Sequence, residues 1–166
     1  MMTNRRICFF GDTNKVMQFD VITEKWTIKT ISGRTSNEFL YYAAAVTLPN
    51  GDALITGGGS STMVYQYVTA KDELIVKKSM NQMRKEHAAV VSENQVFVMG
   101  GYDGVQNVFL NCCEVYNLQK NEWNYIAPMN ISKCAFSATV VNKKNIYTFG
   151  GYDGHNRLDT IERYNL

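Results

Sequence analysis

Apolar and polar residues alternate along many short stretches of this chain, and each such stretch predicts a half-buried β-strand. The segment from Gln95 to Trp123 contains a whole unit of this kind. An apolar strand ends at a glycine pair, a loop follows, and a second strand carries Glu114-Val115-Tyr116. A polar turn then separates Tyr116 from Trp123, which opens a third strand. No segment shows sustained helical periodicity, so the pattern predicts an all-β chain.

The unit recurs along the chain. The aromatic residue of its second strand is found at Phe19, Tyr67, Tyr116 and Tyr164, in steps of 48, 49 and 48 residues. The residue that opens its third strand is Trp26, Leu74 and Trp123, in steps of 48 and 49. The glycine pairs follow steps of 43 and 50 and stand at Gly57-Gly58, Gly100-Gly101 and Gly150-Gly151, with Gly11-Asp12 at the first such place. The loop after the glycines therefore varies in length, whereas the aromatic frame does not.

The predicted strands number three, four, four and three in successive repeats. Four-stranded units of this length cannot bury both faces alone, and stacking them radially gives a β-propeller. We expect a partial blade over 5–31, whole blades over 41–80 and 87–129, and a partial blade over 135–166. The stretch from Tyr41 to Leu48 could form a helix on its alanine content, but the repeat register favours a strand. Residues 1–166 are thus expected to form a single incomplete propeller domain, or a fragment of one.

These repeats resemble the kelch repeat. In that family a glycine pair ends the second strand, an aromatic residue lies on the third, and a tryptophan opens the fourth after six residues. Tyr116 to Trp123 and Phe19 to Trp26 both keep that spacing. The GGYDG sequences at Gly100 and Gly150 and the LDTIERYNL sequence of 158–166 are similar to the kelch domains of BTB-kelch adaptor proteins. Leu74 replaces the tryptophan in the second repeat, and BTB and BACK regions are absent.

The amino-acid composition and net charge limit the classes of function that the chain can have. A hydrophobic content of 45% and a charged content of 19% are typical of a folded globular protein. A net charge of +2 gives no case for binding nucleic acid or an anionic membrane. Neither a signal-peptide pattern nor a membrane-spanning run is found, so we expect a cytoplasmic protein. The four cysteines lack a disulfide spacing and are expected to be free thiols that pack as small hydrophobic residues.

The sequence offers no catalytic constellation. His87 precedes an expected inner strand, where a packing role is favoured, and His155 lies in a loop where contact with a partner is favoured over metal binding. No cluster has the spacing of metal ligands or of a catalytic triad, so we expect no enzyme activity, no cofactor and no metal. A sugar-modifying or oxidase enzyme on a kelch scaffold, and a nonfunctional truncated remnant, remain as alternatives.

The resemblance implies that loops between the second and third strands, and loops between blades, gather on one face that binds a protein partner. The segments concerned are Gly33–Glu38, Ser60–Thr62, Asn81–Glu86, Tyr102–Asn111, Asn130–Lys133 and Tyr152–Arg157. The candidate partner-binding residues are Arg84, Tyr102, Asp103, Lys133, Tyr152, Asp153, His155, Asn156 and Arg157. The basic members would favour an acidic peptide, or they only solvate the surface, and the two aspartates could instead form turns. Such a module could recognise substrates for a ubiquitin-ligase adaptor, or it could associate with actin.

An incomplete propeller also exposes two blade faces that have no neighbour. We expect Trp26 and Phe19 to lie on or near the first open face, and Phe136, Tyr147 and Tyr164 on or near the last. Exposed apolar faces promote association, so self-association is expected as well.

Overall fold

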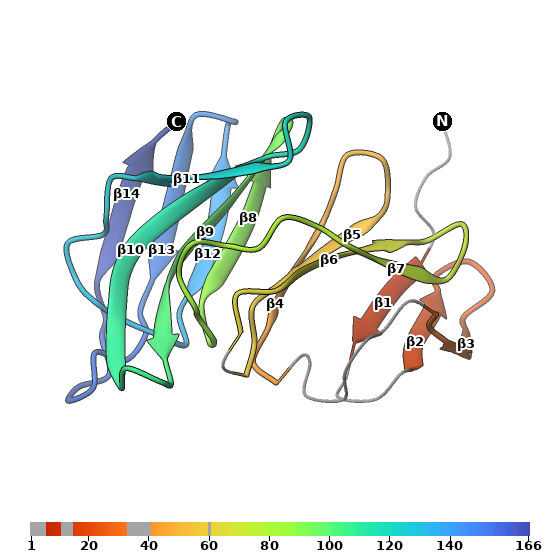
Figure 1. Ribbon diagram of the computed structural model, residues 1–166, viewed down its shortest axis with the longest axis horizontal. Coiled ribbons are helices and arrows are strands. Elements are labelled where there is room, and N and C mark those ends of the chain that lie inside the picture. Colours follow the sequence, from red (N-terminus) through yellow and green to blue (C-terminus); the bar gives the residue numbers. More distant parts are fainter. Residues whose placement is uncertain (1–5, 11–14, 33–40, 60) are drawn as a thin grey trace.

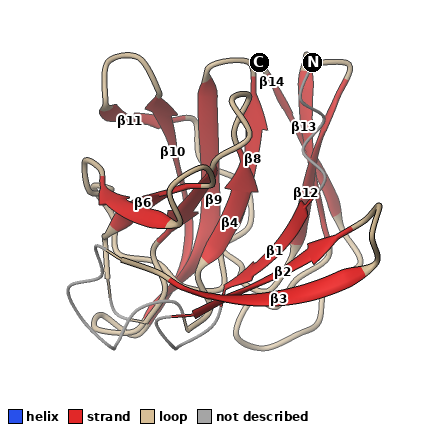
Figure 2. Ribbon diagram, turned by 90° about the vertical axis from the view of Figure 1, so that its right-hand side faces the viewer, coloured by secondary structure: helices blue, strands red, loops and turns tan. Residues whose placement is uncertain are grey.

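A computed structural model describes residues 6–10, 15–32, 41–59 and 61–166. Within these ranges the chain forms fourteen strands and no helix, and so no helix that could cross a membrane (Figure 2). The strands are β1 (Arg6–Phe10), β2 (Lys15–Asp20), β3 (Lys25–Thr30), β4 (Ala44–Thr47), β5 (Ala53–Thr56), β6 (Val64–Val68), β7 (Glu73–Val76), β8 (Ala88–Ser92), β9 (Gln95–Asp103), β10 (Val108–Asn117), β11 (Glu122–Ile126), β12 (Ser137–Val141), β13 (Asn145–Phe149) and β14 (Ile161–Asn165). Three parts of the sequence prediction lie outside the described residues: the first glycine position at Gly11-Asp12, the predicted loop over Gly33–Glu38, and Ser60.

The strands form four antiparallel sheets of three, four, four and three strands. We name them blade I (β1–β3), blade II (β4–β7), blade III (β8–β11) and blade IV (β12–β14). The sheets follow one another in chain order (Figure 1), and β8 lies beside both β4 and β12, which makes these first strands the innermost ones. The predicted all-β, incomplete propeller and its strand count are confirmed.

The aromatic frame has the predicted register. Tyr116 pairs with Trp123 across β10 and β11, and Tyr67 pairs with Leu74 at the same place in blade II. The Tyr116 and Trp123 rings stack at 4.8 Å, and Trp123 Nε1 donates to the Lys78 carbonyl at 2.8 Å. Both rings are buried in a cluster with residues from blade II, including Leu54 and Val64. The core therefore lies between blades, where each sheet covers the next.

The glycine pairs bring neighbouring blades into close backbone contact. Gly58 N donates to the Arg84 carbonyl at 3.0 Å, and Gly101 N donates to the Lys133 carbonyl at 2.8 Å. Gly101 has a φ of +100°, and a Cβ there would lie 2.7 Å from the Lys85 carbonyl oxygen. Only glycine fits both the conformation and the space.

Two segments differ from the sequence prediction. The innermost strand of blade II begins at Ala44, because Tyr41 and Tyr42 form a turn in which Tyr42 has a φ of 60°. The segment from Tyr102 to Asn111, predicted as a loop, is largely strand, since Tyr102 pairs with Phe109. A register shift between Leu110 and Cys113 marks a β-bulge that this longer hairpin requires.

The two outer faces of the arc are partly as predicted. Trp26 is 53% exposed on blade I, where its ring packs at a tilt against the rings of Phe9 and Phe19. On blade IV the prediction agrees with Tyr147, which lies on the outer face, and is wrong for the other two residues: Phe136 is buried against blade III, and Tyr164 packs against the same cluster. Alternation along the strands turns other residues outward in their place.

The residues exposed on the outer face of blade IV include Val141, Phe149 and Ile161, and half-buried Tyr147 stacks on Phe149.

The core between blades II and III provides a test of this packing. Replacing Trp123 with alanine removes a buried ring and leaves a cavity, so we expect a loss of about 3–5 kcal/mol in the free energy of unfolding. Urea denaturation of both proteins measures it. Trp26→Ala, at the equivalent but exposed position, is the matched control and should lose far less. Equal losses for the two variants would contradict the register.

Candidate functional site

Aromatic side chains from three blades meet in a row on one part of the surface. Lys85 Nζ lies 5.8 Å from the ring centroid of Tyr42 and 5.4 Å from that of Tyr102. The ring of Phe109 lies 5.1 Å from Tyr102 and 5.7 Å from Tyr152. We call these five residues the aromatic row. Tyr42 is 60% exposed and Tyr152 is 39% exposed, so both ends of the row face solvent.

The long hairpin of blade III is what bridges the row. Its Tyr102 and Phe109 pair across β9 and β10, and Tyr102 OH donates to Asn107 Oδ1. Phe109 lies directly beneath the following loop of blade IV, where a Cβ on Gly154 would be 2.6 Å from the ring. Gly154 has a φ of +100°, so this position needs glycine for two independent reasons. The structure thus brings the predicted residues Tyr102 and Tyr152 onto one surface through Phe109.

The two predicted aspartates stabilise turns. Asp103 is buried and accepts hydrogen bonds from Val105 N and Gln106 N, both at 2.9 Å. Asp153 accepts from Asn156 N at 2.6 Å and from His155 N at 2.7 Å, and these bonds lower the pKa of its carboxyl. The turn-forming alternative for these residues is therefore supported. His155, Asn156 and Arg157 follow on the same loop with exposed side chains.

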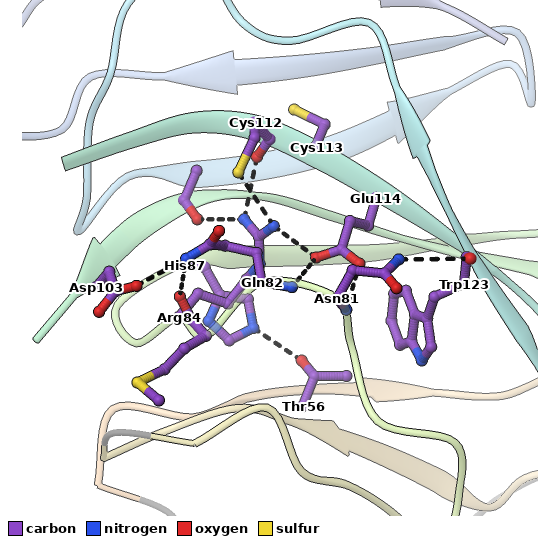
Figure 3. Close-up of polar contacts among 12 residues, drawn as sticks. Thr56, Asn81, Gln82, Arg84, His87, Asp103, Cys112, Cys113, Glu114 and Trp123 are labelled. Atoms are coloured by element: carbon purple, nitrogen blue, oxygen red, sulfur yellow. Dashed lines mark hydrogen bonds and ion pairs between the residues drawn. The ribbon is translucent and has the colours of Figure 1, made fainter. Parts of the chain in front are cut away.

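Arg84 does not face a partner, which corrects the sequence-based expectation. Its side chain is fully buried, and Nη2 forms an ion pair with Glu114 Oε1 at 2.8 Å (Figure 3). Nη1 donates to the carbonyls of Gly100 at 2.6 Å and Cys112 at 3.0 Å.

The carboxylate of Glu114 also accepts two hydrogen bonds from backbone N–H groups. Asn81 N donates to its Oε2 at 2.8 Å and Gln82 N donates to its Oε1 at 3.1 Å. The ion pair between Arg84 and Glu114 therefore holds the segment between blades II and III against β10, and its role is structural.

Lys133 requires the same correction. It is fully buried, and its Nζ lies 3.1 Å from Glu162 Oε1 and 5.3 Å from the ring centroid of Phe136. Glu162 Oε2 accepts a hydrogen bond from Asn130 N at 2.6 Å. The arrangement repeats that of Arg84 and Glu114 one blade earlier, and it likewise neutralises the cation.

Sequence reasoning missed this pair of pairs, although a signal was present. Arg84 and Lys133 are 49 residues apart, and Glu114 and Glu162 are 48 apart, so both partners recur with the repeat. A polar residue that keeps the period of the buried frame is expected to be buried with it. Of the aromatic row, Lys85 and Phe109 lie within the predicted binding segments Asn81–Glu86 and Tyr102–Asn111 but were not singled out, and Tyr42 was missed. Lys85 was predictable because alternation turns it away from buried Arg84.

His87 is a packing residue, as the sequence suggested. It is buried, and its Nε2 lies 2.8 Å from the Thr56 hydroxyl oxygen. Burial first, and then the nearby charge of Arg84, lower the pKa of the imidazole to about 3. His87 is therefore neutral in the folded protein at physiological pH.

All four cysteines are free. Burial raises the pKa of the Cys113 thiol to about 11, which keeps it protonated. In the part of the chain that the structure describes, no three His, Cys, Asp or Glu side chains come together as a metal site would require.

Comparisons with known proteins agree with the repeat. The family model described as "Kelch motif" matches residues 83–130 and 133–166. The chain is 35% identical to human Kelch-like protein 6 over 105 residues, which cover 63% of this chain and 16% of that protein. It is 31% identical to mouse Kelch-like protein 35 over 109 residues, which cover 64% and 18% of the two chains. Human Kelch repeat and BTB domain-containing protein 12 is 22% identical over 111 residues, which cover 60% and 18%. The chain thus spans less than a fifth of these relatives.

Removing Arg84 should destabilise the fold. Arg84→Ala leaves Glu114 buried and uncompensated, so we expect a loss of about 3–5 kcal/mol in the free energy of unfolding. Arg84→Lys, which copies the pair made by Lys133, should lose less, and exposed Arg157→Ala should change stability by less than about 0.5 kcal/mol. Chemical denaturation of the three variants gives these values. An Arg84→Ala protein as stable as the wild type would show that the pair does not hold the blades.

The free energy of unfolding should decrease as the pH is lowered, because of His87. The unfolded state takes up a proton as the pH drops below about 6.5, whereas the folded state resists protonation down to about 3. As the pH is lowered from about 6.5 to about 5, the free energy of unfolding should decrease by about 2 kcal/mol. Denaturation curves across that range measure the slope. His87→Gln should abolish the slope and His155→Gln, at the only other histidine, should keep it; the reverse result would contradict the assignment.

Proposed function

Since this chain belongs to the kelch-repeat family and is related to the BTB-kelch proteins, we propose that it is a protein-binding module. The observation that carries the proposal is the aromatic row, which joins three blades on one surface. Tyrosine and aromatic side chains are enriched at the centres of protein interfaces, because they bury a large apolar area and keep a polar tip.

We propose that the partner presents a peptide segment to this row and to the adjoining loop of blade IV. The exposed loop residues His155, Asn156 and Arg157 would supply polar contacts at its edge. Arg84 and Lys133 are neutralised inside the protein by glutamates, so the positive charge available to an acidic segment comes from Lys85 and Arg157. An acidic peptide remains the proposed class on these two side chains.

The proposed function is binding of a protein partner, with no catalytic step. The nine residues predicted from sequence include three that are buried, two that are half-buried and four that are exposed, and they supply no nucleophile paired with a base. The BTB-kelch resemblance suggests two settings for this binding: substrate recognition within a ubiquitin-ligase adaptor, and association with actin.

For the cellular compartment we propose the cytoplasm, with which four free thiols are compatible.

Selection from a peptide display library tests the function. Peptides that bind the wild-type protein should be enriched in acidic residues, and the Tyr102→Ala/Tyr152→Ala double variant should bind them at least about ten-fold more weakly. Tyr125→Ala is the matched control, because Tyr125 is an exposed tyrosine on β11, away from the row, and its removal should leave affinity unchanged. Lys85→Glu should weaken binding and reduce its salt dependence. Selected peptides that bind the double variant as tightly as the wild type would refute the assignment of this surface.

A further inference from the structure

The turn between β4 and β5 contains an asparagine followed directly by a glycine, Asn50-Gly51, which is the only such pair in the chain. In a pair of this kind the backbone nitrogen of the glycine can attack the asparagine side chain, because no glycine side chain obstructs it. Gly51 has a φ of 87°, a conformation that favours glycine. The residue that the turn requires is therefore also the residue that makes Asn50 chemically labile.

Hydrogen bonds hold every atom that would react. Asn50 Nδ2 donates to Asp52 Oδ2 at 2.9 Å, and Asp52 N donates to Asn50 Oδ1 at 3.1 Å. Gly51 N, which would be the nucleophile, donates to the Leu48 carbonyl at 2.9 Å. Asn50 is exposed, so water can reach it. The restraint on this side chain therefore comes from its hydrogen bonds and not from burial.

The carboxylate of Asp52 is fixed in turn by its neighbours. Gln66 Nε2 donates to Asp52 Oδ2 at 2.6 Å, and Thr69 N donates to Asp52 Oδ1 at 3.1 Å. The Thr69 hydroxyl also donates to the Gly51 carbonyl at 2.9 Å. At the base of the turn, Leu48 is buried in the core between blades II and III. The geometry of the turn is thus linked both to β6 and to the packing between blades.

We propose that Asn50 is a site of spontaneous deamidation, that the hydrogen bonds of the folded turn slow the reaction, and that its product destabilises blade II. Gly51 N loses its proton to a base in the solvent and forms a bond to Asn50 Cγ. The bond from Cγ to Nδ2 breaks, and Nδ2 takes up one proton from water and leaves as ammonia. Water then opens the resulting succinimide at either carbonyl and gives aspartate or isoaspartate.

Both products change the contacts of the turn. The Nδ2 donor is replaced by a carboxylate that faces Asp52 Oδ2, so an attractive contact becomes a repulsion between like charges. Isoaspartate also adds one carbon to the backbone path, in a turn that Leu48 N closes by donating to the Asp52 carbonyl at 2.8 Å. The site lies at the opposite end of β4 from Tyr42, and the inference does not depend on the proposed binding function.

Mass spectrometry of peptides from the 166-residue protein measures the rate at residue 50 under mildly alkaline conditions. The folded protein should deamidate at least about ten-fold more slowly than the protein unfolded in guanidinium chloride, because the hydrogen bonds must first open. Asp52→Ala removes the acceptor for Nδ2, so this variant should react faster than the wild type when both are folded. The two proteins should react alike when unfolded.

A second variant covers the case in which Asp52→Ala does not fold. Thr69→Val removes the hydroxyl that bonds to the Gly51 carbonyl and keeps the Asp52 carboxylate, and it should also react faster than the folded wild type. Equal rates for the folded and the unfolded wild-type protein would overturn the proposal. Folded variants that react no faster than the wild type would overturn it as well.

Thermal melts test the effect of the product on stability. Asn50→Asp, which reproduces one product, should lower the melting temperature by about 2–4 °C. Asn94→Asp is the matched control, because it makes the same charge change at an exposed residue in the turn between β8 and β9, and it should have a smaller effect. Prolonged incubation should lower the melting temperature of the wild type and leave that of Asn50→Gln unchanged. An Asn50→Asp protein as stable as the wild type, or an equal loss in incubated Asn50→Gln, overturns the proposal.

Discussion

Backbone hydrogen bonds between equivalent residues of successive blades are the constraint on which the rest of the structure depends. Glu86 N donates to the Tyr42 carbonyl at 2.9 Å, and Ala135 N donates to the Glu86 carbonyl at 2.8 Å. These three residues have φ values of 60°, 53° and 51°, so the chain turns in the same left-handed way as it enters each innermost strand. The glycine pairs add the bonds to Arg84 and Lys133 beside this line. Because the links join main chains, they fix the distance between blades whatever side chains the repeats carry.

That spacing divides the side chains into two groups with different roles. At the entry to blade III the chain is extended, so Arg84 points inward to Glu114 while Lys85 points outward between two tyrosine rings. A buried charge pair is a weak source of net stability, but it is costly to break, and it therefore specifies one arrangement of the blades. The outward neighbour forms no ion pair of this kind, and it is one of the residues that we propose for recognition. One dipeptide thus combines a buried structural cation with a cation on the candidate binding surface.

Most of the fold was predictable because its signals are periodic. Steps of 48 and 49 residues between Phe19, Tyr67, Tyr116 and Tyr164 predicted the register that the structure shows. The site was less predictable, because charge type alone does not reveal burial. Arg84 and Lys133 were assigned to a binding face when each is neutralised by a glutamate about 30 residues away in sequence. The direction of Phe136 and Tyr164 was wrong for a related reason, since the face on which a strand residue lies follows from register and not from hydrophobicity.

The candidate binding surface arises where the repeat is broken. Between the glycine pair and the next strand, blade II has a short connection, whereas blade III extends β9 and β10 into a long hairpin. The extension carries Phe109 over to blade IV, where the absence of a side chain at Gly154 makes room for its ring. It also places Tyr102 beside Lys85, which continues the row to Tyr42 in blade II. A shorter hairpin would keep the inter-blade core intact but would remove the ring that connects blades III and IV. Variation in loop length can therefore change the recognition surface without disturbing the periodic contacts that hold the blades together.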